Sequence, residues 1–223
     1  MLQGSEEWHL FRLGNLTASR CHEAIAETRS GYSASRQRLM DELVNERLTG
    51  ERKETTPTAA MQWGIDTEHL AREKYEKIKG CTVAEVGTIM HPRIKESSAS
   101  PDGLVGECGL IEIKCPNTTT MVNTVLKGKI PENYQTQMAW QLACTERDWC
   151  DFVMYDPRLP ENRSIWVMRY QPTKDHIAEL EQKIIVFLEE TRERVLSFEK
   201  SIDANFARQS IEDVTETCKN RSG

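Results

Sequence analysis

The sequence predicts a mixed α/β fold in which a central, mixed β-sheet is flanked by helices. Three observations support this prediction. Helical patterns come first, short apolar segments bounded by Gly or Pro follow, and a helix, two strands and a long closing helix complete the order. Such an order fits a sheet covered by helices better than a helix bundle or a β-sandwich. With 223 residues and no internal repeat, the chain is expected to form one domain.

Two helices are predicted in the N-terminal part, over residues 18–25 and 35–48. The second carries Leu39 and Leu43 at helical spacing, and Gly50 follows as an ending signal.

The next segment, residues 51–58, is polar and contains one proline, so it is predicted to be an exposed loop. A charged helix is predicted over 67–78 and is stopped by Gly80. Glu68 falls in the first turn of this predicted helix, where the helix macrodipole favours a carboxylate.

Strands are predicted on both sides of a further helix. Residues 82–89 and 109–115 are short and apolar, and they are expected to form a hairpin or meander. A helical pattern over 133–144 follows. Two more strands are predicted over 149–155 and 164–170, joined by the turn sequence DPRLPEN.

The closing helix is predicted over 173–200, with a charged face opposite one apolar stripe. That stripe consists of Ile177, Leu180, Ile184, Phe187, Thr191, Val195 and Phe198. The following residues are polar and are expected to fray. The chain is therefore predicted to form a single domain over residues 1–200, with a polar, flexible tail over 201–223.

Composition narrows the class of protein. Hydrophobic residues make up 38% and charged residues 29%, as in a soluble globular protein. No apolar run could span a membrane and the N-terminus lacks signal-peptide order, so a cytoplasmic location and no membrane partner are expected. The seven cysteines lack CxxC spacing, and the histidines lack metal-ligand spacing. Trp8 and Trp63 are interpreted as core aromatics.

A net charge of −6 argues against a protein that coats nucleic acid, because non-specific affinity for DNA comes from Lys and Arg that neutralise phosphates. It is compatible with an enzyme that gathers its basic residues in a channel, and carboxylates that bind metal ions also add to the acidic total.

The segment SASPDGLVGECGLIEIKCP contains the strongest chemical signal. Glu112 and Lys114 lie two residues apart on a predicted strand and therefore face the same side. Asp102, from the preceding turn, can join Glu112 in an oxygen-rich site for Mg²⁺, with the carbonyl of Ile113 as an extra ligand. Lys114 could then orient or deprotonate the attacking water. The alternative is an exposed strand of alternating charge after a common Asp-Gly turn.

These residues resemble the PD-(D/E)xK core of restriction-endonuclease-like nucleases and, more closely, the lambda exonuclease-like (YqaJ-type) viral recombinase family. Six blocks carry the resemblance in order between Trp8 and Arg158. They are WHLFRLGNLTAS, the Trp-Gly pair ahead of Glu68, SPDG, EIKCP, the glutamine-rich helix with Tyr134 and Gln137, and YDPR. The resemblance implies that residues 1–200 form a nuclease domain.

The resemblance adds two residues to the catalytic set of Asp102, Glu112 and Lys114. Glu68 matches an acidic residue near the metal ions, although a carboxylate at a helix start is the simpler explanation. Gln137 matches a polar residue near the active site, and its alternative is a solvated helix position.

A pocket for the 5′-phosphate of the cut strand is also implied by the resemblance. Arg12, Ser19 and Ser100 match its residues, and arginine and serine suit a phosphate chemically. Without the resemblance, Arg12 is a surface charge and Ser19 a helix cap.

Three further residues are implied to contact DNA. Arg29 matches an arginine that contacts the strand. Met61 stands where the family uses an apolar wedge between terminal base pairs, although a methionine ahead of a helix is more often core. Tyr134 is the third and could equally be core.

The resemblance implies a 5′-to-3′ exonuclease on linear double-stranded DNA. Two-metal hydrolysis with Mg²⁺, or with Mn²⁺ as an alternative, would release 5′-mononucleotides and leave 3′ single-stranded overhangs for recombination by strand annealing. It also implies a single-strand annealing protein as partner, a homotrimer ring around the DNA, and a phage or prophage origin in a bacterial cytoplasm.

Two rival functions share part of this evidence. A structure-specific or restriction-like endonuclease would use the same Asp102, Glu112 and Lys114 but need not recognise a 5′-phosphate. A catalytically inactive DNA-binding module would be expected to carry a denser basic patch. Sensitivity to the 5′-phosphate separates the exonuclease from the endonuclease.

Overall fold

The computed structural model describes residues 5–52, 56 and 58–220, with the side chains described as far as residue 206. The predicted loop over 51–58 therefore lies largely outside the described residues. Among the helices described, none is long and apolar enough to cross a membrane.

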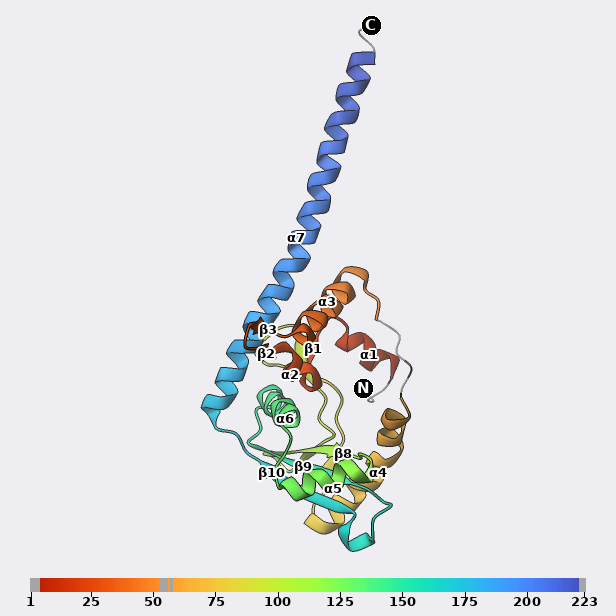
Figure 1. Cartoon of the computed structure of the whole chain (residues 1–223), viewed down its shortest axis with the longest axis vertical. Helices are drawn as coiled ribbons and strands as arrows, with labels where there is room; N and C mark the ends of the chain where they lie inside the picture. The colour runs from red at the N-terminus through yellow and green to blue at the C-terminus, as the bar shows by residue number, and fades with distance from the viewer. Residues whose placement is uncertain (1–4, 53–55, 57, 221–223) are drawn as a thin grey trace.

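A five-stranded mixed sheet forms the centre of the lower body in Figure 1. Its order is β10 (Ile165–Tyr170), β9 (Trp149–Tyr155), β8 (Gly109–Lys114), β7 (Gly103–Val105) and β4 (Val83–Ala84). Only β8 and β9 run parallel, and the other neighbours are antiparallel. The predicted mixed sheet flanked by helices is confirmed. The predicted strand over 82–89 is corrected, because only Val83–Ala84 of that range joins this sheet and Ile89 belongs to a separate small sheet. The short strand β7, which was not predicted, lies between β4 and β8.

Strand β8 is covered on both faces, which explains its almost continuous burial. Ile111 and Ile113 face helix α4 (Ala59–Lys79) and share a core with its Ala71 and Tyr75. Leu110 faces the other side, in a core with Met138 from α6 (Glu132–Thr145). Since strand side chains alternate, Glu112 and Lys114 also face α6.

The parallel strands β8 and β9 are joined by a crossover through two helices, as parallel pairing requires. Helix α6 matches the predicted helix over 133–144. Helix α5 (Thr118–Lys127) was not predicted; it begins at the capping residue Asn117, whose side chain accepts a hydrogen bond from the Thr120 amide, and ends at Gly128.

Helix α4 corrects the predicted helix over 67–78, because it begins at Ala59, eight residues earlier. The Thr58 side chain caps it by accepting from the Met61 amide. Glu68 therefore lies in the middle of the helix, and the macrodipole at a helix start does not explain it.

The N-terminal part packs above the sheet. It contains α1 (Glu6–Arg12), the 3₁₀ turn η1 (Ala18–Arg20), α2 (Cys21–Ala24), the hairpin of β2 (Glu27–Thr28) and β3 (Gly31–Tyr32), and α3 (Ala34–Thr49). A small sheet joins β1 (Leu16–Thr17) to β6 (Ser97–Ala99) and β5 (Ile89–Met90). The predicted helices over 18–25 and 35–48 are confirmed by η1 with α2 and by α3.

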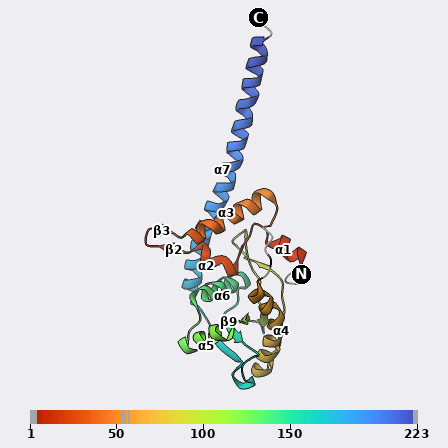
Figure 2. The same ribbon diagram turned by 45° about the vertical axis from the view of Figure 1, so that its right-hand side comes forward.

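A last 3₁₀ turn, η2 (Glu161–Arg163), lies between β9 and β10, and helix α7 (Lys174–Asn220) closes the chain. Its first half packs on α3 and α6 through Leu180, Ile184 and Phe187. The helix was predicted to end near Lys200 but continues to Asn220, and both Figure 1 and Figure 2 show its second half projecting beyond the body.

Candidate active site

Asp102, Glu112 and Lys114 meet where β7 and β8 lie side by side. The Asp102 carboxylate Oδ2 accepts a hydrogen bond from the Ile113 backbone N–H at 2.6 Å, which ties the turn to the strand. The Lys114 ammonium pairs with Glu112 Oε1. Glu112 is 1% exposed, so its carboxylate oxygens are satisfied by these neighbours instead of by water.

Helix α6 holds the Glu112 carboxylate from one face. Gln137 Nε2 donates to Oε1 at 2.7 Å, and Gln141 Nε2 donates to Oε2 at 2.5 Å. The two glutamines are four residues apart and therefore lie on the same side of the helix. The sequence hypothesis placed Gln137 near Glu112, and the structure puts the two in contact, whereas Gln141 was not singled out. The sequence feature that could have identified Gln141 is its spacing of four residues from Gln137, which places both on one face of a helix.

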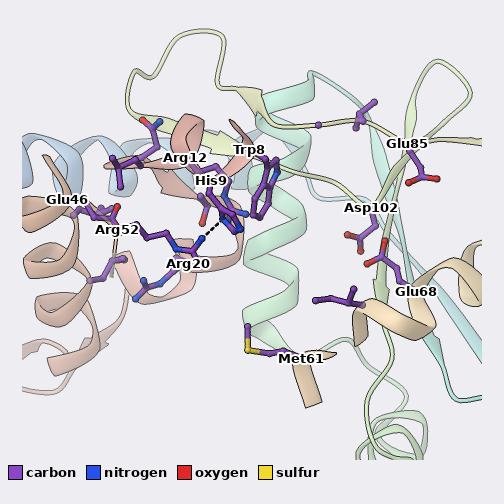
Figure 3. Close-up of a pocket in the computed structure, with 18 of the residues that line it drawn as sticks. Trp8, His9, Arg12, Arg20, Glu46, Arg52, Met61, Glu68, Glu85 and Asp102 are labelled. Atoms are coloured by element: carbon purple, nitrogen blue, oxygen red, sulfur yellow. Dashed lines mark hydrogen bonds between the residues drawn. The ribbon is translucent and has the colours of Figure 1, made fainter. Parts of the chain in front are cut away.

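Glu68 approaches the same site from α4. Figure 3 shows the carboxyl groups of Glu68 and Asp102 pointing toward one another. Arg72 binds Glu68 Oε1 at 2.6 Å and Glu85 Oε1 at 2.9 Å, and so links α4 to the segment after β4. The structure thus brings Glu68 to Asp102, Glu112 and Lys114, although the sequence separates it from them by more than thirty residues.

Burial and mutual repulsion shape the electrostatics of these groups. Burial, followed by the charges of Glu112 and Glu68, raises the pKa of Asp102 well above its usual value. Burial also raises the pKa of Glu68, against the opposing charge of Arg72. For Lys114, burial lowers the pKa, but the charges of Glu112 and Asp102 outweigh it and hold the pKa above its usual value. The carboxylates thus form a site that favours cations.

The donor set at this site suits a hard divalent cation. Asp102, Glu112 and Glu68 bring carboxylate oxygens to this region, and Mg²⁺ prefers oxygen ligands. As the side chains stand, no group of three His, Cys, Asp or Glu within the described ranges is gathered tightly enough to hold an ion. Glu112 is instead engaged by Lys114 and the two α6 glutamines. The backbone of Ile113 lies in the site, and a role for its carbonyl stays a prediction.

A groove of about 1140 Å³ runs from Asp102 and Glu68 toward α1 and α3 (Figure 3). Four arginines line it, namely Arg12, Arg20, Arg52 and Arg72. Apolar side chains, among them Trp8, Met61 and Ile65, line it as well. This mixture of guanidinium groups and apolar surface suits a phosphate chain that carries bases.

Trp8 links two of the proposed phosphate ligands. The Arg12 guanidinium stacks on its ring at 3.8 Å from the centroid, and its indole N–H donates to Ser100 Oγ at 3.2 Å. Burial, and then the charge of Arg52, lowers the pKa of Arg12 to about 10. Trp8 is half-buried and lines the groove, so the expectation of a core aromatic was wrong.

Trp63 also departs from the core role. It is half-buried within α4, and the Arg158 guanidinium lies over its ring at 4.7 Å. Arg158 in turn binds the buried Asp156 at 2.6 Å, and Asp156 accepts from the Thr118 hydroxyl at the start of α5. The YDPR block therefore ties the end of β9 to α5 and α4.

The remaining residues of the sequence hypothesis fall in different places. Met61 is 55% exposed in the first turn of α4 and lines the groove, so the alternative of a core methionine is wrong. Tyr134 stacks on Phe152 at 5.3 Å and lies under the Lys114 ammonium at 5.2 Å, so it serves the core and borders the site.

Ser19 and Arg29 do not line the groove. Ser19 is exposed in η1, where its hydroxyl lies 3.4 Å from that of Thr17, and Thr17 and not Ser19 occupies the cap position of that turn. Arg29 is exposed in the β2–β3 turn, which Figures 1 and 2 show on the other side of the body from α1 and α4. Their DNA contacts stay predictions.

Comparison with known proteins places these features in a family. The model of the YqaJ-like viral recombinase domain matches residues 7–148. An alkaline exonuclease from Laribacter hongkongensis is 44% identical in sequence, with 90% of this chain and 99% of that chain covered and a TM-score of 0.84. The structure of the same exonuclease in complex with dAMP matches equally well.

A more distant structure shares the fold. A phage-related exonuclease from Haemophilus somnus is 12% identical, with 83% of this chain and 96% of that chain covered and a TM-score of 0.65. Among curated proteins, no match was found. The chain belongs to the family of YqaJ-like viral recombinase domains.

Proposed function

We propose that this protein is a magnesium-dependent exonuclease that degrades linear double-stranded DNA from the 5′ end. It would release 5′-mononucleotides and leave 3′ single-stranded overhangs. The observation that carries the proposal is one groove that joins Asp102 and Glu68, next to Lys114, to Arg12 stacked on Trp8. The identity of 44% to an alkaline exonuclease supports the exonuclease class.

The acidic end of the groove would perform the hydrolysis. Asp102, Glu112 and Glu68 are the residues that would hold Mg²⁺ or Mn²⁺, as two ions in the family mechanism, with the Ile113 carbonyl as an additional ligand. When bound, such ions stabilise negative charge on the phosphate and increase the acidity of water.

Lys114 is placed to act on the attacking water. Its ammonium is held by Glu112 and lies beside Asp102, so it can donate a hydrogen bond toward the water and fix the direction of attack. Gln137 donates its amide to Oε1 of Glu112, the same oxygen that Lys114 pairs with, and it acts by positioning this carboxylate.

The arginine-rich end of the groove would select the substrate. Arg12 offers a fork of donors to a terminal 5′-phosphate. Arg12 and Ser100 both contact the indole of Trp8, so both can contribute to one pocket. Ser19 would complete this pocket. Met61, exposed on the same groove, is suited to separate the terminal base pair, with Tyr134 and Arg29 as further DNA contacts.

The related exonuclease was crystallised with dAMP, a deoxynucleoside monophosphate. This supports mononucleotides as products for the present chain, because a product-sized ligand bound to a protein with the same fold indicates a site of matching dimensions.

Three further parts of the proposal rest on family membership. They are a homotrimer that encloses the DNA, a single-strand annealing protein as partner, and a phage or prophage origin with action in the host cytoplasm.

The test is digestion of a linear duplex with Mg²⁺, with its ends either 5′-phosphorylated or 5′-hydroxyl. A closed circle and the Lys114→Ala variant serve as controls. Release of mononucleotides from the phosphorylated linear duplex alone supports the proposal. Cutting of the circle would indicate an endonuclease of the same core, and no cutting at all would indicate a DNA-binding module.

A further inference from the structure

Gln141 is buried where an apolar side chain would be expected. It is 0% exposed in α6, and the other buried residues of this helix are Met138, Ala139, Trp140, Leu142, Ala143 and Cys144. Buried amides are destabilising unless their hydrogen bonds are made. The Gln141 amide nitrogen makes a hydrogen bond, but its oxygen, Oε1, accepts none within the described part of the chain. Gln141 is therefore a poor choice for helix packing alone.

The bond that Gln141 does make is to a carboxylate of the proposed metal site. Its Nε2 lies 2.5 Å from Glu112 Oε2, while Gln137 Nε2 lies 2.7 Å from Oε1. One helix face thus grips both oxygens and fixes the rotation of the carboxylate about its last bond. Lys114 and Gln137 both act on Oε1, whereas Gln141 acts on Oε2, so Gln141 supplies the restraint on the second oxygen.

The two amides still leave room for other partners on Glu112. A carboxylate offers about four acceptor positions. Gln137, Gln141 and Lys114 use three of them, so at least one lone pair remains for a cation. The clamp therefore orients Glu112 without saturating it.

From this geometry we infer that Gln141 is a positioning residue that presets Glu112 as a metal ligand. This inference rests on the proposed function, since it concerns how the same site binds its ion. Residues that orient metal ligands typically change metal affinity by about 10- to 100-fold when they are removed. Gln137 is half-buried and can exchange its hydrogen bond with water, whereas the fully buried Gln141 cannot, so Gln141 is expected to have the larger effect.

The variant Gln141→Met keeps the length and volume of the side chain and removes the donor. The matched control is Gln135→Met. Gln135 lies on the same helix, is half-buried and donates its amide to the Ile130 carbonyl at 2.7 Å, away from Glu112. Thermal unfolding is recorded for both variants, and Gln141→Leu provides a second apolar replacement in case methionine packs badly.

Two quantities are measured on the full chain. Binding of Mn²⁺ is followed by its electron paramagnetic resonance signal without DNA, and digestion of a 5′-phosphorylated duplex is followed at increasing Mg²⁺. We expect Gln141→Met to weaken Mn²⁺ binding by about 10- to 100-fold. We also expect its digestion rate to recover at high Mg²⁺, and Gln135→Met to behave as the wild type. Because a bound ion also stabilises the folded state, rescue supports the inference only for a variant that thermal unfolding shows to be folded without the ion.

Unchanged Mn²⁺ affinity in a folded Gln141→Met variant would overturn the inference. So would failure of both Gln141 variants to fold, because the amide would then serve stability alone. Wild-type protein that binds Mn²⁺ and loses affinity in Gln141→Met, but digests no DNA, would support the clamp and contradict the proposed exonuclease. The two proposals can therefore fail separately.

Discussion

The indole N–H of Trp8 donates a hydrogen bond to the hydroxyl of Ser100 at 3.2 Å, and this contact connects α1 to the turn that carries Asp102. The guanidinium of Arg12 stacks on the ring of the same Trp8. One aromatic side chain thus holds the Arg12 guanidinium and the Ser100 hydroxyl near each other, two residues from Asp102.

Trp8→Phe should retain part of the stacking with Arg12 and lose the bond to Ser100, whereas Trp8→Leu should lose both. We expect the preference for 5′-phosphorylated over 5′-hydroxyl ends to fall moderately in the first variant and more strongly in the second. The measurement is the ratio of initial digestion rates on the two duplexes. Equal ratios in both variants and the wild type would remove Trp8 from the pocket.

Arg12→Lys keeps the positive charge but loses the forked donor, and Arg12→Ala loses both. Because a hydrogen bond to a charged group contributes about 1.5–3 kcal/mol, we expect Arg12→Ala to reduce the rate on phosphorylated ends by about 10- to 100-fold. The rate of Arg12→Lys on phosphorylated ends should lie between those of the wild type and Arg12→Ala. The exposed Arg163, which does not line the groove, supplies the control Arg163→Ala. A similar loss on hydroxyl ends would indicate general DNA binding instead.

Lys114→Ala should reduce cleavage by about 10²- to 10⁴-fold, the range expected for loss of a group that acts on the attacking water. The amides of Gln137 and Gln141 still donate to Glu112 when Lys114 is lost, so the fold should persist, and circular dichroism and thermal unfolding check this. Lys127→Ala, in the last turn of α5, is the matched control. Retained full activity in Lys114→Ala would exclude the proposed mechanism.

His91 should make stability depend on pH. The side chain is buried, its Nδ1 accepts hydrogen bonds from the Arg93 and Ile94 amides, and its ring stacks on Trp140 at 4.9 Å. Burial lowers the pKa of His91 below its usual 6.5, against the opposing charge of Glu181. The unfolded chain therefore binds a proton more readily than the folded chain.

Stability contributed by neutral His91 is present above pH 6.5 and is lost as the pH falls below that value. We expect the urea midpoint of the wild type to decrease more steeply between pH 7 and pH 5 than that of His91→Gln, which cannot titrate. Parallel pH profiles for the two proteins would show that His91 binds a proton equally well in both states.

Much of the chemistry was accessible from the sequence because it follows local rules. Glu112 and Lys114 lie two apart on a strand that the apolar pattern identified, and β9 occupies the predicted range. Alternation along a strand fixes which side chains share a face, so the pair could be placed together without tertiary information.

What the sequence hid depends on tertiary packing. The helix α5 begins with three threonines, which have low helix propensity, and its capping residues Asn117 and Gly128 decide its limits. Gln141 sits among apolar residues, and only the proximity of Glu112 gives its amide a role. Trp8 resembles a core residue in sequence, because nothing local reveals that α1 borders a groove.

The second half of α7 has a practical consequence for anyone who purifies this protein. Residues 201–220 alone add about 30 Å of helix beyond a compact body, at roughly 1.5 Å per residue. Such a rod increases frictional drag far more than it increases mass. Gel filtration calibrated with spherical standards will therefore overstate the molecular weight, and light scattering is the method that will count the subunits.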